Sequence, residues 1–317
     1  MDALYNAAKP RVVAIGGPTA TGKTALSVAL AKRFGGEIIS ADSMQIYQGL
    51  DVGTAKVTPE EMQGVPHHLV GFLAPEQAFS VADFTILAGK TITQLTAQGK
   101  LPLVVGGTGL YITSLLNGIG FTPEKVDPAI RQELQARLQA EGSQALYAEL
   151  AAVDPGYAAK VHPNNTPRVI RALELYRATG RKMSAEREAA RPAEKPYRSL
   201  CLCLTCRDRT LLYQRIDTRC DRMMQSGILE EAKLVYDHRD TYRTAAQAIG
   251  YKEFFPFFEG TAALDECADK LKQASRNYAK RQLTWFRHMD GVVWLDASAP
   301  DAAARAVRLT REFLAKG

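Results

Sequence analysis

The sequence lacks the features that mark membrane and secreted proteins. No apolar run approaches the eighteen or so residues that a membrane-spanning helix needs. The first residues, Met1 to Tyr5, have neither the basic flank nor the apolar stretch of a secretion signal. We therefore predict a cytoplasmic protein that has no membrane partner.

Cysteine is also scarce. The chain has only five cysteines, an odd number that argues against a disulfide framework. Three of them, Cys201, Cys203 and Cys206, form a cluster, but no second cysteine pair or histidine cluster completes a zinc site. Their alternation is more typical of a buried strand. The pair His67 and His68 has no partners in the sequence either, and we predict a structural role for it.

The composition has no repeat and no low-complexity tract. Forty basic against 34 acidic residues leave a net charge of +6, which is compatible with a polyanionic partner but is weak support on its own. A chain of 317 residues exceeds one typical domain, so we expect a large core with an added piece.

Short apolar runs alternate with helical spacing in the first third of the chain. Helices are predicted from Lys23 to Phe34 and from Ser80 to Gln98, the second with Ser80 as its cap and Asp83 three residues later. This alternation predicts an α/β fold whose parallel sheet is covered on both faces. The buried strands are predicted at residues 11–15, 37–41 and 101–105.

The pattern changes between residues 121 and 196, where nothing resembles a strand. Apolar stripes at helical spacing predict helices there, one of which begins with Asn165 as its cap and Pro167 in its first turn. We therefore predict a core of residues 1–120 and 197–317 with an inserted all-helical domain at 121–196. The returning core is predicted to contain strands at 199–205 and 292–295 and helices at 209–225 and 264–288.

A glycine-rich loop joins the first strand to the first helix. Residues 17–24 (GPTATGKT) fit the G-x-x-x-x-G-K-[ST] pattern, with a predicted strand before it and a predicted helix after it. Such a loop points successive N–H groups and the helix dipole at a phosphate. Lys23 would reach the terminal phosphate, and the Thr24 hydroxyl would bind Mg²⁺. The loop predicts a P-loop NTPase-like core and a di- or triphosphate ligand, without showing which one.

The other parts of a nucleotide-hydrolysing site are missing. The chain has no Asn-Lys-x-Asp motif of the kind that reads guanine. The strand at 101–105 ends in glycines and a threonine, where an ATPase usually carries an acid. Asp296 follows the last strand and is more typical of a turn.

Polar residues follow two further strands, at the sheet edge where ligands of parallel sheets bind. Asp42 is the best candidate for a general base, although an Asx-turn or a role as Mg²⁺ ligand would also explain it. Thr108 is a second candidate, although it could merely cap the following helix.

Seven blocks of sequence resemble the bacterial tRNA dimethylallyltransferase family, in family order and across nearly the whole chain. Two departures are small: Val57 stands where a proline is common, and Gly71 where an acid is frequent. The blocks are residues 17–24 (GPTATGKT), 40–47 (SADSMQIY), 51–56 (DVGTAK), 66–69 (PHHL), 106–111 (GGTGLY), 162–168 (HPNNTPR) with 171–174 (RALE), and 279–287 (AKRQLTWFR).

This resemblance implies transfer of a dimethylallyl group from its diphosphate to the N6 amine of adenosine-37, beside the anticodon of tRNA. Asp42 would accept the amine proton, and Thr108 would orient the bridging oxygen of the diphosphate. Lys23 and Arg219 would stabilise the leaving diphosphate together with Mg²⁺ at Thr24, although an arginine like Arg219 is otherwise typical of a solvated helix face.

The resemblance also implies two sets of binding residues. We expect a monomeric enzyme, although the sequence does not reveal the oligomeric state. The predicted diphosphate-binding residues are Gly17, Pro18, Thr19, Ala20, Thr21, Gly22, Lys23 and Thr24. The predicted tRNA-binding residues are Asp42, Ser43, Met44, Gln45, Thr108, Arg131, Thr166, Pro167, Arg168, Val169, Ile170, Gln247, Gly250, Tyr251 and Lys252.

Two other functions would use the same loop. A small-molecule kinase would consume ATP and carry arginines in a short lid, whereas the insertion here is long and helical. A nucleic-acid-binding module with a regulatory nucleotide site would leave Asp42 and Thr108 without roles. A basic stripe of Arg276, Lys280 and Arg287 on the late helix is by itself more typical of a solvated face than of an RNA surface.

Overall fold

The computed structural model describes residues 9–121, 127–190, 192 and 194–316. The chain folds into two compact units: residues 1–116 with 195–317, and residues 117–194. These limits lie within a few residues of the predicted boundaries. None of the helices in the described residues is long and apolar enough to span a membrane.

The first unit is built on one parallel sheet of six strands in the order β3-β2-β4-β1-β5-β6. Five strands coincide with predicted ones. The sixth, β3, is a two-residue strand of His67 and His68 that pairs with β2, and sequence patterning missed it because it is so short. The strands are β1 (Arg11–Gly16), β2 (Gly36–Ser40), β3 (His67–His68), β4 (Leu101–Val105), β5 (Arg198–Thr205) and β6 (Val292–Asp296).

Alternate residues of the central strand β1 enter two different cores. Val12 and Ala14 pack with α3, α4 and the end of α12, whereas Val13 and Ile15 pack with α1 and α13. Both faces of the sheet are therefore covered, as the continuous apolar strands require. The covering helices are α1 (Lys23–Phe34), α3 (Val81–Ala97), α4 (Gly109–Leu116), α12 (Leu264–Arg287) and α13 (Ala302–Ala315).

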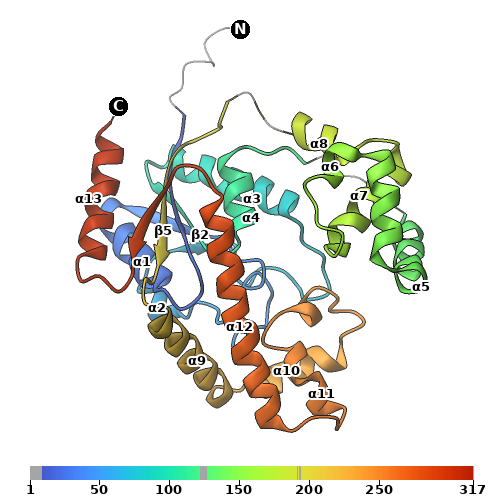
Figure 1. Cartoon of the computed structure of the whole chain (residues 1–317). Helices are drawn as coiled ribbons and strands as arrows, with labels where there is room; N and C mark the ends of the chain where they lie inside the picture. The colour runs from blue at the N-terminus through green and yellow to red at the C-terminus, as the bar shows by residue number, and fades with distance from the viewer. Residues whose placement is uncertain (1–8, 122–126, 191, 193, 317) are drawn as a thin grey trace. The chain divides into compact units, whose positions relative to one another are not determined.

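A third core lies beyond the sheet, along α12. In Figure 1 the helix α9 runs beside α12, with α10 and α11 near the N-terminal end of α12. Tyr47 and Leu50, from the loop after β2, are also buried in this core. Its further elements are α9 (Arg209–Gln225), α10 (Ile228–Asp237), η1 (Ala245–Gln247), η2 (Lys252–Phe254) and α11 (Phe255–Phe258).

Side-chain caps form at some of the predicted helix starts but not at all of them. Ser80 and Asp83 form the predicted capping box of α3, and Thr58 and Glu61 form another at α2 (Pro59–Met62). The predicted side-chain cap of α7 (Thr166–Thr179) is wrong, because Asn165 makes no such hydrogen bond. Pro167 in the first turn, which needs no N–H partner, still favours a helix start there.

The second unit contains helices and no strand among its described residues. α5 (Pro128–Val153) packs on α7 around Leu134, Leu146 and Leu173, and the short helices α6 (Pro155–Ala158) and α8 (Met183–Ala189) complete the unit. The predicted helical insertion accordingly has a small apolar core of its own.

Candidate functional site

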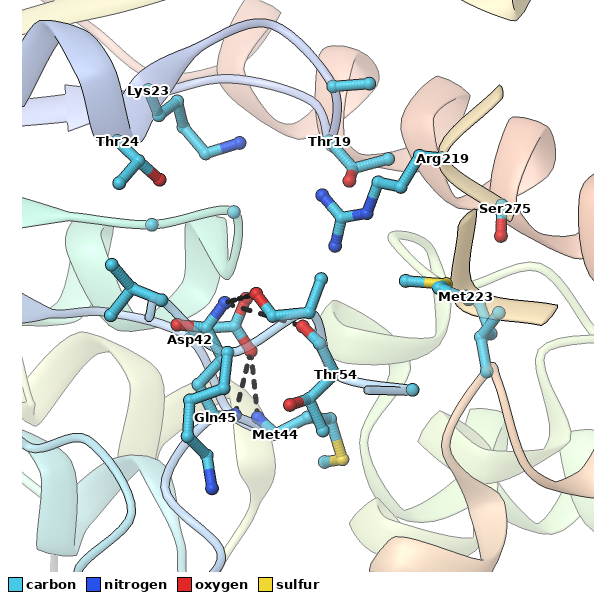
Figure 2. A pocket seen from close by; sticks show the side chains of 18 of the residues that line it. Thr19, Lys23, Thr24, Asp42, Met44, Gln45, Thr54, Arg219, Met223 and Ser275 are labelled. Carbon is cyan, nitrogen blue, oxygen red and sulfur yellow. Dashed lines mark hydrogen bonds between the residues drawn. The ribbon is translucent and has the colours of Figure 1, made fainter. Parts of the chain in front are cut away.

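One large cavity opens at the carboxyl ends of β1, β2 and β4 in the first unit. Its volume is about 1470 Å³. In Figure 2 Thr19, Lys23, Thr24 and Arg219 lie on one side, which we call the phosphate wall (residues 19–24 and Arg219). Asp42, Met44, Gln45 and Thr54 lie on the other, which we call the carboxylate wall (residues 42–45 and 51–56).

The cavity lining is strongly basic. Eight lysines and arginines line it against three acids, Asp42, Asp51 and Glu61. This excess of positive charge favours an anionic ligand. The basic residues are Lys23, Lys56, Arg215, Arg219, Arg222, Arg243, Lys252 and Arg281.

The glycine-rich loop is closed by its own side chains. Lys23 Nζ and Thr21 Oγ1 both donate to the Pro18 carbonyl, at 2.7 and 2.8 Å. Burial, reinforced by the positive charge of Arg219, lowers the pKa of Lys23 to about 8. A bound phosphate would offer this ammonium a better partner than a neutral carbonyl oxygen.

Arg219 is the second cation of the phosphate wall. It extends from α9, is partly buried, and points toward Thr19 in Figure 2. Its guanidinium makes no hydrogen bond or ion pair with the described residues, and burial lowers its pKa. Arg219 therefore lies inside the cavity rather than on a solvated helix face, and its donors are available to an anion.

Asp42 uses one carboxylate oxygen for structure and leaves the other unbonded. Oδ1 accepts the N–H groups of Met44 at 2.9 Å and Gln45 at 3.3 Å. The Asx-turn interpretation is thus correct for this oxygen. Oδ2 has no hydrogen-bond partner among the described residues, so Asp42 is also free to accept a proton from a ligand.

Thr108 connects two strand-end loops. Its Oγ1 accepts the Ser43 N–H at 3.1 Å and donates to the Ser43 hydroxyl at 3.4 Å, and the Tyr278 side chain lies near it. Thr108 does not itself line the cavity, although Ser43 and Tyr278 do. Its predicted contact with the bridging oxygen of a diphosphate stays a prediction.

Sequence reasoning missed Gln282, a buried residue of α12. Its Oε1 accepts the Thr19 N–H and its Nε2 donates to the Gly107 carbonyl, both at 3.0 Å. A Cβ at position 107 would lie 2.1 Å from that nitrogen, so any other residue there would displace the Gln282 amide. One side chain thus joins the phosphate loop to the loop after β4. Gln282 lies within the family block at residues 279–287, but the sequence could not show what it contacts.

Tyr278, one turn earlier on α12, was also missed. Its hydroxyl lies near the side chains of Thr108 and Gln282, and burial together with the negative charge of Asp42 raises its pKa to about 12. It therefore stays a neutral donor near pH 7.

The predicted tRNA-binding residues of the first unit differ in access. Ser43, Met44, Gln45, Gln247 and Lys252 line the cavity. Gly250 and Tyr251 do not, because Tyr251 is buried in the third core and Gly250 is buried against the Gly53 backbone.

The predicted tRNA-binding residues of the second unit surround a smaller hollow of about 540 Å³. Arg131, Thr166, Pro167 and Ile170 line it, and Arg131 also pairs with Glu174 at 2.9 Å. Arg168 is exposed, whereas the side chain of Val169 is buried in the core and could offer only its backbone.

The described residues contain no group of three or more histidines, cysteines or acids that could hold a metal, and all five cysteines are free and buried. Thr24 lies on the cavity wall, and its hydroxyl has no partner in the described part of the chain. Such a sparse donor set fits Mg²⁺ held largely by phosphate oxygens and water.

Asp296 accepts hydrogen bonds from the N–H and hydroxyl of Ser298 in a turn, as expected.

Comparisons with known proteins match this chain along most of its length. The family model for IPP transferase matches residues 45–289, and that for isopentenyl transferase matches residues 10–70. The tRNA dimethylallyltransferase of Bacillus subtilis is 50% identical over 93% of both chains, and that of Geobacillus thermodenitrificans is 47% identical over 96% of both.

Solved structures agree. A tRNA isopentenylpyrophosphate transferase from Bacillus halodurans matches with a TM-score of 0.72 and 45% identity, over 96% of this chain and 97% of that one. A eukaryotic dimethylallyltransferase described as acting on tRNA matches with a TM-score of 0.80 and 31% identity, over 96% and 79%. Because these matches extend through both units and include the phosphate loop, the chain belongs to the IPP transferase family, that of the tRNA dimethylallyltransferases.

Proposed function

We propose that this enzyme transfers a dimethylallyl group from dimethylallyl diphosphate to the N6 amine of adenosine-37 in tRNA and releases diphosphate. One observation carries the proposal. A single cavity holds phosphate-binding cations on one wall and, on the other, a carboxylate with an unbonded oxygen. That pairing suits a reaction in which an anion leaves and a proton must be removed.

The phosphate wall would act on the leaving group. As the carbon–oxygen bond of the donor breaks, its electron pair goes to the diphosphate, where negative charge develops. The loop N–H groups, Lys23 and Arg219 would donate hydrogen bonds to that charge. Because the charge is larger in the transition state than in the bound donor, these groups would stabilise the transition state more and so lower the barrier. Mg²⁺ bound at Thr24 would neutralise further charge on the same oxygens.

The carboxylate wall would act on the acceptor. The adenine amine is a poor nucleophile because its lone pair is delocalised into the ring. As the new carbon–nitrogen bond forms, the nitrogen becomes acidic, and Asp42 Oδ2 would accept the proton. Thr108 would hydrogen-bond the bridging oxygen of the donor and orient the leaving group.

The acceptor base must leave the anticodon loop to reach the cavity, and enzymes that act on bases turn them out of the stack. Ser43, Met44, Gln45, Gln247 and Lys252 would contact the loop at the cavity, with Arg131, Thr166, Arg168 and neighbouring backbone on the helical unit. We propose a monomer that acts on tRNA in the cytoplasm.

The test is transfer of label. The full chain is incubated with Mg²⁺, radiolabelled dimethylallyl diphosphate and an unmodified tRNA transcript, with a transcript carrying guanosine at position 37 as control. We expect label in the first RNA and none in the second. Absence of label from both, with ATP-dependent phosphorylation of a metabolite, would show a kinase instead.

A further inference from the structure

A glutamate outside the cavity holds one of its walls. Glu231, on α10, accepts three consecutive backbone N–H groups of the carboxylate wall. Oε2 accepts those of Asp51 at 2.7 Å and Val52 at 2.9 Å, and Oε1 accepts that of Gly53 at 2.8 Å. Oε1 also accepts the Tyr251 hydroxyl at 2.6 Å. Four hydrogen bonds thus converge on one carboxylate.

The backbone N–H groups of residues 51–53 form a site that suits a carboxylate. Three successive N–H groups that point at one place form an anion-binding concavity, and Glu231 fills it from about 180 residues further along the chain. Burial and the charge of Glu231 raise the pKa of Tyr251, so its hydroxyl stays a donor. A Cβ at position 53 would lie 2.4 Å from the Tyr251 ring, so the ring packs there only against glycine.

The loop of residues 51–56, which Glu231 holds, also lines the cavity. Residues 51–56 line the cavity, and the Gln45 amide donates to the carbonyls of Thr54 at 3.4 Å and Ala55 at 2.9 Å. The Gln45 N–H in turn donates to Asp42 Oδ1. Hydrogen bonds therefore join Glu231 to the loop, the loop to the Gln45 side chain, and the Gln45 backbone to Asp42.

We infer that Glu231 is a positioning residue for the acceptor side of the reaction. It fixes residues 51–56, and through them it holds Gln45 and the unbonded oxygen of Asp42 where the adenine must dock. The inference rests on the proposed function for what enters the cavity. All four hydrogen bonds of Glu231 go to residues 51–53 and Tyr251, and none goes to the phosphate wall, so its loss affects tRNA and leaves the diphosphate donor almost unaffected.

The test is Glu231→Gln in the full chain, with Glu230→Gln as the matched control. Both substitutions remove one charge from α10, but Glu230 is exposed and makes no hydrogen bond with the described residues. Glu231→Gln also turns an acceptor into an NH₂ group that faces N–H or O–H donors. We expect the KM for tRNA to rise about tenfold and kcat to fall, while the KM for dimethylallyl diphosphate changes less than about twofold. Glu230→Gln should behave as wild type.

A double-mutant cycle with Gln45→Ala tests the route. If Glu231 acts through Gln45, the two changes together should raise the KM for tRNA little more than Gln45→Ala alone. Should Glu231→Gln fail to fold, Tyr251→Phe removes one of the four bonds and keeps the charge. It should give a smaller rise of about threefold, with the same lack of additivity.

Three results would overturn the inference: an unchanged KM for tRNA, an equal rise in the KM for the donor, or full additivity with Gln45→Ala. A lower melting temperature with unchanged KM values would mean a purely structural role. The wild-type enzyme separates this failure from failure of the proposed function, since only the latter would leave wild-type tRNA without label.

Discussion

The two walls of the cavity are built by different means. The phosphate wall is formed mainly by one short segment, whose lysine and threonine hydroxyl bond to its own backbone. The carboxylate wall is held by residues far away in the chain, with Thr108 against Ser43 and Glu231 against residues 51–53. Much of the binding site for a leaving group can thus be arranged locally, with Arg219 added from α9, whereas the place of an incoming nucleophile depends mainly on the assembled fold.

The largest expected effect lies on the carboxylate wall. Asp42→Asn keeps an acceptor for the Met44 and Gln45 N–H groups but cannot take a proton. We expect kcat to fall about 10²–10⁴-fold. Single-turnover rates measure this, and filter binding should show the affinity for tRNA within about threefold of wild type. A variant that retains near wild-type turnover would remove Asp42 as the base.

The matching change on the phosphate wall is Lys23→Met. Loss of the ammonium should lower kcat/KM for dimethylallyl diphosphate about 10²–10³-fold, because the charge on the leaving group loses a donor. The affinity for tRNA should not change. Lys32→Met, on an exposed turn of the same helix, is the control and should be silent. Steady-state kinetics at varied donor concentration decide the outcome, and equal losses in both variants would contradict it.

Gln282→Leu tests whether the phosphate wall also depends on a distant residue. It leaves the Thr19 N–H and the Gly107 carbonyl without their partner at little change in volume, a cost of about 1–3 kcal/mol in stability. We expect about a tenfold lower kcat/KM for the donor, measured beside thermal unfolding. Gln273→Leu, exposed on the same helix, is the control. Lower stability with unchanged kinetics would show that the loop holds itself.

The smallest expected effect is a shift in the pH at which kcat/KM for the donor declines. Lys23, with a pKa of about 8, carries its charge below that pH and loses it above. The kcat/KM for the donor, which reports the free enzyme, should therefore decline as the pH rises through about 8. The charge of Arg219 contributes to the low pKa, so Arg219→Gln should move the decline to higher pH. If the decline in Arg219→Gln stays at the same pH or moves to lower pH, a group other than Lys23 causes it.

Sequence patterning predicted most of the fold correctly, because its determinants are local. The apolar strands, the capping box at Ser80 and the phosphate loop each depend on residues a few positions apart. β3 was missed because two residues carry no period, and the cap at Asn165 was wrong because a capping residue type does not ensure a capping hydrogen bond.

The site was partly predictable for the same reason. Lys23, Asp42 and Arg219 were named from motif and resemblance, and all three line one cavity. Gln282, Tyr278 and Glu231 were not named, since each acts through a partner far away in the sequence. Tyr251 and Val169 were predicted as tRNA contacts, but their side chains are buried, which motif matching does not reveal.

The sequence by itself determined the family, the parallel α/β core, the helical insertion and the anion-binding loop. Tertiary structure alone decided which oxygen of Asp42 is unbonded, which side chain joins the loops after β1 and β4, and what holds residues 51–56. The physical reason is that a backbone conformation follows from neighbouring residues. The partner of a buried polar group is set by which segments the fold brings within hydrogen-bonding distance.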